Sequence, residues 1–390
     1  MKEIKYIGFY CDMDHITNEE RYNSPAANTK INYICETLNK IGYKVFFVSA
    51  CETTGKKSHG KKIVDLDDIN KLLLFRTFGR KNLIYLIIRK ISIKMQMFLF
   101  LLFRVKKGEI VIAYHSLLTM HCLYFLRKIK KIKVIYEVEE LYCDVNENFS
   151  KMKKKMEIKI INTFDGYIFP TVSIVEKLQI KKNYVICCGI YKAEKSEPIL
   201  YKDDKIRIVY AGTLEKEKGG AINAINAMRF LGDRYVLYLL GTGTRTEIQD
   251  IKSRIQKINE EKGYEKIKFE GLLNGQLYIE FLQKCDIGLS TQSLNLRLND
   301  TSFPSKILSY LSNGLNVIST DIPVVKNSPI SNIISFCVSN KPEDIACSIL
   351  NLKKTEYQEV KHRLCELDKQ FQAELEKLLN LLNEVYLYGE

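Results

Sequence analysis

Short apolar strands alternate with amphipathic helices along this chain, and that alternation constrains its fold more than any other feature. Residues 4–9, 44–49 and 109–113 are apolar runs of strand length, and 28–41 has helical spacing that ends at Gly42. Strands that are separated by helices form parallel sheets, because each crossover helix covers a face of the sheet. The first half of the chain is therefore predicted to be an α/β domain.

The alternation stops in the polar stretch 192–204 and then restarts at residue 206. Strands are predicted at 206–210, 235–240, 267–270, 287–290 and 316–319, with helices between them. A chain of 390 residues also exceeds what one hydrophobic core usually supports. The sequence thus predicts two Rossmann-like, doubly wound domains, 1–195 and 196–368, followed by a helical stretch at 369–390.

Composition narrows the possible partners. The net charge of +14 favours anionic partners such as phospholipid, phosphorylated ligands or nucleic acid, although a Lys-, Ile- and Asn-rich composition accounts for part of it. No nucleic-acid-binding module is recognisable, so nucleic acid is not expected as a partner. The 11 cysteines are odd in number and form no C-x-x-C pair, which favours a reducing cytoplasm over a disulfide framework.

Residues 83–105 are the most apolar segment, but Arg89, Lys90 and Lys94 interrupt it. Its longest apolar run is far shorter than the ~20 residues of a membrane-spanning helix. Two interpretations stay open. The segment is either a core helix with a basic exposed end or a helix that lies on an anionic membrane surface.

Two loops after strands of the second half have the composition of phosphate-binding turns. The first runs from Gly212 and Thr213 to Lys218, whose ammonium can reach a phosphate. The second contains Gly241 and Gly243, and small residues there allow a ligand to approach the backbone. Either loop can equally be an ordinary turn, because a lone G-x-G is a weak signal.

A third candidate loop precedes the helix predicted at 306–312. Pro304 suits the first turn of a helix, so the amides of Ser305, Lys306 and Ile307 are expected to be free to bind an anion. Lys306 adds a full positive charge. Ligands bind beyond the carboxyl ends of the strands in such sheets, which is where all three loops are expected.

These segments, in this order, resemble the donor half of retaining glycosyltransferases close to glycosyltransferase family 4. The resemblance rests on Gly212-Thr213-Leu214 with Lys218-Gly219, on Gly241 and Gly243, on Phe269-Glu270-Gly271 followed by Leu272, and on Ser312–Ile318. The F-P-S-K sequence at 303–306 is similar to polysaccharide-assembly members. In the first half, 33–49 and 134–142 resemble the acceptor-side segments of the same family.

The resemblance implies two Rossmann-like domains that face each other across a cleft, with the helix at 369–390 crossing back to the first domain. It also implies a bacterial, cytoplasmic enzyme, which is either free in the cytoplasm or peripheral at the inner face of the plasma membrane. This enzyme would transfer a sugar from a nucleotide-sugar donor to a glycan or lipid-linked acceptor, with retention, in surface polysaccharide, capsule or glycolipid synthesis.

The sequence departs from the family pattern at several positions. The arginine of the family after the first glycine is Thr213 here, its E-x7-E pair falls on Thr301 and Ser309, and its acceptor-side histidine is Glu139. Ser309 is nevertheless the residue expected to meet the donor ribose, with a weaker hydrogen bond than a glutamate makes. These changes leave open an alternative, a catalytically weakened protein that binds partners in a glycan-assembly complex.

On the acceptor side, Glu139, Glu140 and His15 are the candidate catalytic residues, because each can orient or deprotonate a hydroxyl. The two glutamates can equally be surface carboxylates, and the histidine can be structural. No cofactor is expected, and no metal, since Asp12-Met13-Asp14 matches a D-x-D motif in letters but lies in the acceptor half. A nicotinamide enzyme is disfavoured because no G-x-G-x-x-G follows the first strand.

Overall fold

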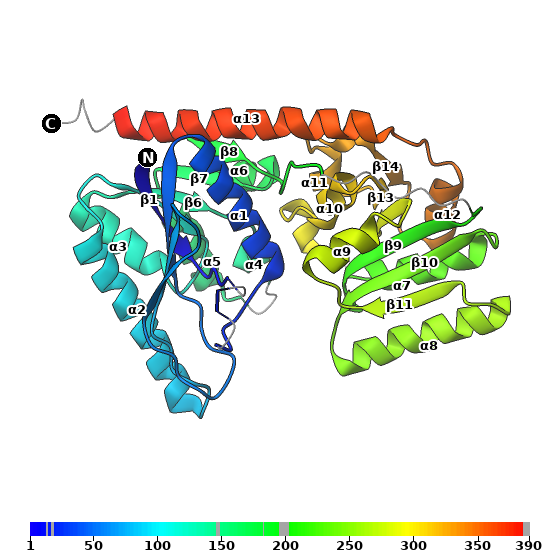
Figure 1. Ribbon diagram of the computed structural model, residues 1–390, viewed down its shortest axis with the longest axis horizontal. Coiled ribbons are helices and arrows are strands. Elements are labelled where there is room, and N and C mark those ends of the chain that lie inside the picture. Colours follow the sequence, from blue (N-terminus) through cyan, green and yellow to red (C-terminus); the bar gives the residue numbers. More distant parts are fainter. Residues whose placement is uncertain (13–14, 17–18, 146–148, 182, 195–202, 385–390) are drawn as a thin grey trace. The chain divides into compact units, whose positions relative to one another are not determined.

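The computed structural model describes residues 1–12, 15–16, 19–145, 149–181, 183–194 and 203–384. The chain divides into two compact units, which are Met1–Cys187 together with Gln370–Glu390, and Cys188–Lys369 (Figure 1). Each unit is built around one sheet whose strands are almost all parallel. The predicted α/β class with two Rossmann-like domains is confirmed. The predicted boundary at 195/196 lies outside the described residues.

Unit 1 contains a sheet of eight described strands in the order β3-β4-β2-β1-β5-β6-β7-β8, parallel except for β3. Its elements are β1 (Lys2–Gly8), α1 (Pro25–Lys40), β2 (Tyr43–Ser49), β3 (Lys62–Asp65), β4 (Lys71–Leu74), α2 (Leu83–Arg104), β5 (Ile110–Tyr114), α3 (Met120–Lys130), β6 (Lys133–Glu137), α4 (Tyr142–Val145), α5 (Lys151–Ile161), β7 (Gly166–Phe169), α6 (Val172–Leu178) and β8 (Tyr184–Ile186).

The central strands of unit 1 have continuous apolar sequences because helices cover both faces of the sheet. In β5, for example, Ile110 to Ala113 are all buried, and β7 is buried along its whole length. The antiparallel strand β3 lies at the edge of the sheet and leaves Ile63 exposed. This burial explains why the central strands were readable in the sequence and the edge strand was not.

Unit 2 contains a parallel sheet of six described strands in the order β11-β10-β9-β12-β13-β14. Its elements are β9 (Ile206–Thr213), α7 (Gly220–Ala227), β10 (Tyr235–Thr242), α8 (Arg245–Lys262), β11 (Ile267–Gly271), α9 (Gly275–Leu282), β12 (Ile287–Ser290), α10 (Lys306–Ser312), β13 (Asn316–Thr320), α11 (Pro323–Lys326), β14 (Ile334–Cys337), α12 (Pro342–Leu350) and α13 (Tyr357–Glu384).

Helix α13 belongs to both units, since the division between them falls at Lys369/Gln370 within it. The part in unit 1 packs through Phe371, whose ring stacks on Tyr33 of α1 at a centroid distance of 5.6 Å. Farther along, Leu378 contacts Gly166 so closely that a Cβ on this glycine would lie 3.2 Å from it. The last helix is therefore part of the core of unit 1.

Helix α2 is one continuous helix over the segment whose role the sequence left open. Ile93, Met97 and Leu101 are buried on its inner face, and Arg89 is buried against Glu52 and the carbonyl of Thr53. The opposite face is apolar and exposed. Within the described residues, no helix has the length and apolar character that crossing a membrane requires.

In unit 2, strands β9 and β10 run in register to their last residues, where Gly212 pairs with Gly241. Gly241 has a φ of 143°, and a Cβ at this position would lie 1.8 Å from the carbonyl oxygen of Gly212. Both the backbone conformation and the lack of space require glycine. The two strands can therefore end side by side, with their backbones in close contact.

We predict that Gly241→Ala destabilises unit 2 by roughly 3 kcal/mol or more, because the methyl group meets backbone that cannot move aside. Gly232→Ala is the matched control in the same unit, since a Cβ there meets nothing within 4 Å. Its effect should stay within about 0.5 kcal/mol. Urea denaturation of both variants, followed by circular dichroism, measures the difference. Equal midpoints for the two variants would contradict the prediction.

Candidate active site

In the sheet of unit 2, the order in which successive strands are added reverses between β9 and β12, the two central strands. From β9 the chain proceeds outward to β10 and β11, and from β12 it proceeds outward on the other side to β13 and β14. Loops after the two central strands therefore diverge, and they leave a crevice in which ligands of such sheets bind. Lys218 lies in the loop after β9, and Lys306 is the first residue of the helix after β12.

A buried tyrosine of α10 fixes this helix to the sheet. The Tyr310 hydroxyl accepts a hydrogen bond of 2.7 Å from the amide of Ala211 in β9. Strand β12 pairs with β9 only as far as Val209. The amide of Ala211 therefore lies past the end of this pairing. The ring fits because β12 has Gly288 there, where a Cβ would lie 2.3 Å from Tyr310 Cδ2. Lys306, one turn earlier on α10, is thereby held next to the end of β9.

The ammonium group of Lys306 lies at the end of β9. Its Nζ is 3.9 Å from the centroid of the Tyr210 ring, and a Cβ on Gly212 would be 3.0 Å from it. Within the part of the chain that the structure describes, no carboxylate pairs with it. Desolvation, together with repulsion from Lys218, lowers the pKa of Lys306 to about 7. A half-buried lysine with a lowered pKa and no counterion is typical of an anion-binding site.

Lys218 supplies the second cation of this region. Its Nζ lies 3.4 Å from Thr213 Oγ1 and 3.2 Å from the carboxylate of Glu215. The turn is tied to the loop after β12, because the amide of Ser293 donates to the Lys218 carbonyl and Thr291 Oγ1 donates to the Gly220 carbonyl. The loops that carry the two lysines are thus held together.

The structure therefore brings Gly212, Thr213, Lys218, Gly241 and Lys306 together at the carboxyl ends of β9 and β10. Gly243 packs against Glu247, which accepts a hydrogen bond of 2.7 Å from the amide of Thr244 at the start of α8. This carboxylate occupies the amino end of α8. Gly243 therefore lies beside a carboxylate that caps α8, and its role toward a donor stays a prediction.

Two further predicted residues precede α10, and a third, Ser309, lies within it. Pro304 and Ser305 precede the helix, which begins at Lys306, so Pro304 does not lie in its first turn as predicted. The amide of Ile307 is not free either, because it donates to the Pro304 carbonyl at 3.0 Å. Because of this hydrogen bond within the loop, the amide of Ile307 does not point freely toward a ligand. Ser309 Oγ donates to the hydroxyl of Tyr278 in α9 at 3.3 Å.

Leu272, the last predicted donor residue, follows β11 and is 59% exposed. The residue before it, Gly271, pairs with Leu240 next to Gly241, so the end of β11 lies beside that of β10. Sequence reasoning missed Tyr210 and Tyr310, which position the Lys306 ammonium and its helix. No pattern in the sequence distinguishes these tyrosines from other buried aromatic residues.

In unit 1, the predicted catalytic residues follow two different strands. Glu139, after β6, forms an ion pair with Lys30 of α1, and this lysine also donates to the Cys187 carbonyl at 2.8 Å. Glu140 is half-buried, and its carbonyl lies 3.0 Å from His115 Nδ1. His15 lies after β1, and its Nδ1 is 3.0 Å from Asp12 Oδ2. The D-x-D motif lies partly outside the described residues.

The sequence did not indicate that buried titratable groups surround Glu139. Glu137, the last residue of β6, is fully buried and hydrogen-bonded to the Tyr6 hydroxyl. Burial, with the neighbouring charge of Glu139, raises the pKa of the Glu137 carboxyl well above its usual range. His115 Nε2 lies 3.3 Å from Glu157 Oε1, and burial lowers the pKa of this histidine to about 4. Among the described residues, no three such side chains are grouped to hold a metal ion.

Comparison with known proteins identifies the domain that carries the two lysines. Residues 192–371 match the family model of glycosyl transferases group 1. This segment, which is somewhat less than half of the chain, is similar to that family. The match contains both central strands of unit 2, the glycines at their ends and Lys218 and Lys306. No curated protein sequence matches the chain.

Solved structures match nearly the whole chain. Sucrose-phosphate synthase from Thermosynechococcus elongatus aligns with a TM-score of 0.69 at 13% identity, over 98% of this chain and 99% of that one. The structure described as "Trehalose-6-phosphate from E. coli bound with UDP-2-fluoro glucose" aligns with a TM-score of 0.66 at 11% identity. The alignment covers 99% of this chain and 98% of that one. The lipopolysaccharide outer core galactosyltransferase WaaB aligns with a TM-score of 0.59 at 14% identity, over 97% of this chain and 99% of that one. At these identities the likeness shows the fold, which is the GT-B arrangement of two Rossmann-like domains.

We predict that unit 2 binds a diphosphate more tightly at pH 6.5 than at pH 8.5. The pKa of Lys306 is about 7 in the free protein, so this lysine loses its proton as the pH rises through that value. A bound anion favours the charged form and raises this pKa, so that binding above pH 7 takes up a proton. Calorimetry with UDP-glucose in buffers of different ionisation enthalpy measures the uptake. Lys306→Met should abolish it, and an uptake that persists in this variant would assign it to another group.

Proposed function

We propose that this protein transfers a sugar from a nucleotide-sugar donor to a glycan or lipid-linked acceptor in surface polysaccharide or glycolipid synthesis. The carrying observation is the Lys306 ammonium, which lies without a carboxylate partner among the described residues, at the crevice of the unit that matches the family model of glycosyl transferases group 1. A uridine diphosphate sugar is the donor class to test first, since a similar fold binds UDP-2-fluoro glucose.

The two lysines match the charge that this reaction develops. When the bond between the sugar C1 and the diphosphate oxygen breaks, negative charge accumulates on the departing diphosphate. Cations that are already in place stabilise this charge without reorganising at the moment of reaction. Lys306, which is partly desolvated, contributes the stronger interaction, and the more exposed Lys218 contributes a weaker one. We propose on this basis that the transfer needs no metal ion or other cofactor.

On the acceptor side, Glu139 is the first candidate to orient the attacking hydroxyl. Its carboxyl group forms an ion pair with Lys30, and a carboxylate oxygen can accept a hydrogen bond from a hydroxyl group. The bond from C1 to the acceptor oxygen forms as the donor bond breaks, and the hydroxyl proton leaves to a nearby base. Glu140 and His15 are further candidates for this role. Retention of the anomeric configuration is proposed from the resemblance to family 4.

The proposed location is the cytoplasmic face of the plasma membrane of a bacterium, where a lipid-linked acceptor is accessible. The exposed apolar face of α2 and the net charge of +14 support contact with an anionic surface. Capsule synthesis belongs to the same proposal, and the fold shared with a lipopolysaccharide galactosyltransferase is compatible with it.

A second candidate is a binding role without turnover in a glycan-assembly complex. The observation that favours it is Ser309, where the resembling family has a glutamate. The Ser309 hydroxyl donates its hydrogen bond to Tyr278, so that a donor ribose would meet a weaker acceptor than a carboxylate. Thr213 likewise supplies no charge to a diphosphate.

We predict that the protein binds a uridine diphosphate sugar and that Lys306→Met raises the Kd at least about tenfold, equivalent to ~1.4 kcal/mol. Lys218→Ala should have a smaller effect, about threefold, because its ammonium is more solvated. Saturation-transfer NMR with a panel of UDP-sugars identifies the ligand, and calorimetry measures the Kd. Lys257→Ala removes an exposed charge from α8 and is the matched control.

Release of UDP from the same sugar, with and without candidate acceptors, separates the two functions. Donor binding with turnover establishes the transferase. Donor binding that depends on Lys306, without turnover on any acceptor, supports the binding role. If no sugar nucleotide binds to the folded protein, the donor site is misassigned and both proposals fail.

A further inference from the structure

One face of α2 is apolar and exposed over most of the helix length. Its inner face is buried in the core of unit 1, while the outer stripe follows helical spacing and contains Ile84, Ile87, Ile88, Ile91, Met95 and Leu99. Each of these side chains is at least 42% exposed. Helix α3 packs beside α2, with the Phe98 and Phe125 rings 6.2 Å apart, and adds the exposed Phe125 and Ile129. A continuous apolar surface of this kind marks an interaction site.

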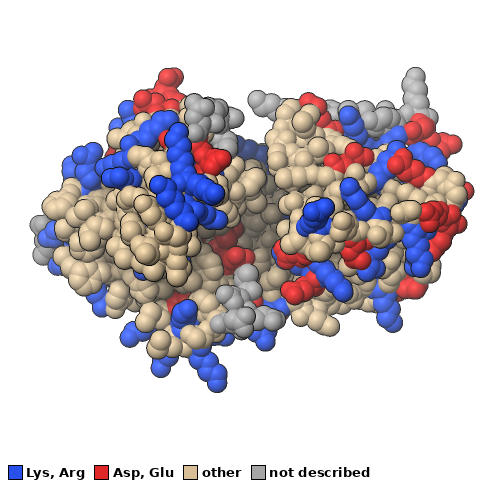
Figure 2. Space-filling view, turned by 90° about the horizontal axis from the view of Figure 1, so that it is seen from below, with Lys and Arg blue, Asp and Glu red and all other residues tan. Residues whose placement is uncertain are grey.

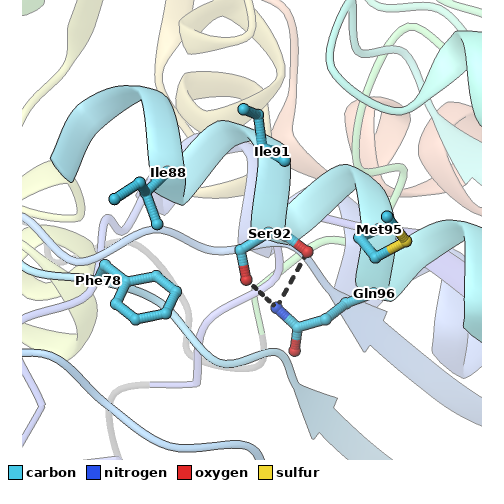
Figure 3. Close-up of a pocket in the computed structure, with 6 residues that line it drawn as sticks. All are labelled: Phe78, Ile88, Ile91, Ser92, Met95 and Gln96. Atoms are coloured by element: carbon cyan, nitrogen blue, oxygen red, sulfur yellow. Dashed lines mark hydrogen bonds between the residues drawn. The ribbon is translucent and has the colours of Figure 1, made fainter. Parts of the chain in front are cut away.

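An apolar groove runs along this stripe. It has a volume of about 350 Å³ and is lined by Phe78, Ile88, Ile91, Ser92, Met95 and Gln96 (Figure 3). The Gln96 side chain holds the segment before α2 in place, because its Oε1 accepts from the Arg76 amide and its Nε2 donates to the Arg76 carbonyl, both at 2.9 Å. Phe78 is therefore fixed beside the helix, and the groove is a built feature of the surface.

Cations accompany the apolar surface. The Arg76 guanidinium lies 4.9 Å from the centroid of the Phe78 ring, and Lys90 and Lys94 are exposed on α2. Between Asp68 and Glu109 the chain contains ten Lys and Arg residues and no Asp or Glu. The face of unit 1 seen in Figure 2 has Lys and Arg side chains gathered beside a broad uncharged area. The chemistry that complements both properties is an apolar chain with an anionic head.

We infer that α2 lies flat in the headgroup region of an anionic phospholipid bilayer, with one acyl chain in the Phe78 groove and a lipid phosphate at Arg76. This inference deepens the proposed location at a membrane and rests on it. A second copy of the chain fits this surface less well, because a symmetric contact would bring the same cations face to face without a carboxylate from this segment. A spanning helix is not involved, since charged residues interrupt the segment.

The chain contains no tryptophan, so a single introduced indole reports on one position without background. We predict that Ile88→Trp shifts its emission to shorter wavelength with vesicles of phosphatidylcholine and phosphatidylglycerol. Phosphatidylcholine vesicles alone should give little shift, and lipids brominated on the acyl chain should quench the emission. Leu350→Trp, in α12 of unit 2, is the matched control because Leu350 is also an exposed aliphatic side chain, at 56% against 42% for Ile88. Its emission should not respond to either vesicle.

Flotation of the full chain with the same vesicles tests the affinity. Ile91→Glu, which introduces a carboxylate into the exposed stripe without disturbing the core, should weaken binding about tenfold or more, and Leu277→Glu in unit 2 should not. Quenching of both tryptophans alike, unchanged flotation of Ile91→Glu, or a concentration-dependent dimer that occludes Ile88 without lipid would overturn the inference. Binding of a UDP-sugar, measured without lipid, tells whether the donor site survives such a failure.

Discussion

The arrangement of unit 2 depends on one hydrogen bond, from the amide of Ala211 to the hydroxyl of Tyr310. A strand amide without a partner in the neighbouring strand must be satisfied in some other way when it is buried. Here a helix supplies the acceptor, and Gly288 leaves the space for its ring. The bond thereby sets the distance between the end of β9 and the start of α10. The position of Lys306 is therefore fixed by the hydrogen bond between its helix and the β9 backbone, and depends less on the flexibility of its own side chain.

The two units treat buried charge in opposite ways. In unit 2, the half-buried Lys306 ammonium has no carboxylate partner among the described residues. The free-energy cost of desolvating this charge is recovered when an anion binds. Unit 1 gathers Glu137, Glu139, His115 and Glu157 near the ends of β5 and β6, where they are held by Tyr6, Lys30 and one another. The carboxylates of this region can orient hydroxyl groups. A cationic crevice and an acidic, hydrogen-bonding region suit a diphosphate donor and a hydroxyl acceptor, respectively.

The sequence predicted most of unit 2 because its strands are short, apolar and regularly spaced. The strand 287–290 and the helix 306–312 have the same bounds in the structure as in the prediction. It did not predict β3, β4 or β14, although β12, which also has four residues, was predicted. In the site, glycines and lysines were readable because their roles are local. Tyr310 was not readable, since its hydrogen bond joins residues 99 positions apart. The prediction that the Ile307 amide is free was wrong, because this amide donates to the Pro304 carbonyl within the same loop.

Helix α13 gives the protein an order of assembly. Unit 2 is continuous in sequence, so a ribosome has released all of its residues before the last turns of α13 are made. Most of unit 1 precedes unit 2 in the sequence, but unit 1 lacks the segment that covers Tyr33 and Gly166 until α13 has been made. Domains that are continuous can fold as they emerge, whereas an interrupted one must wait with apolar surface uncovered. The amino-terminal unit is therefore the last to be completed, and chaperones would meet it before any substrate does.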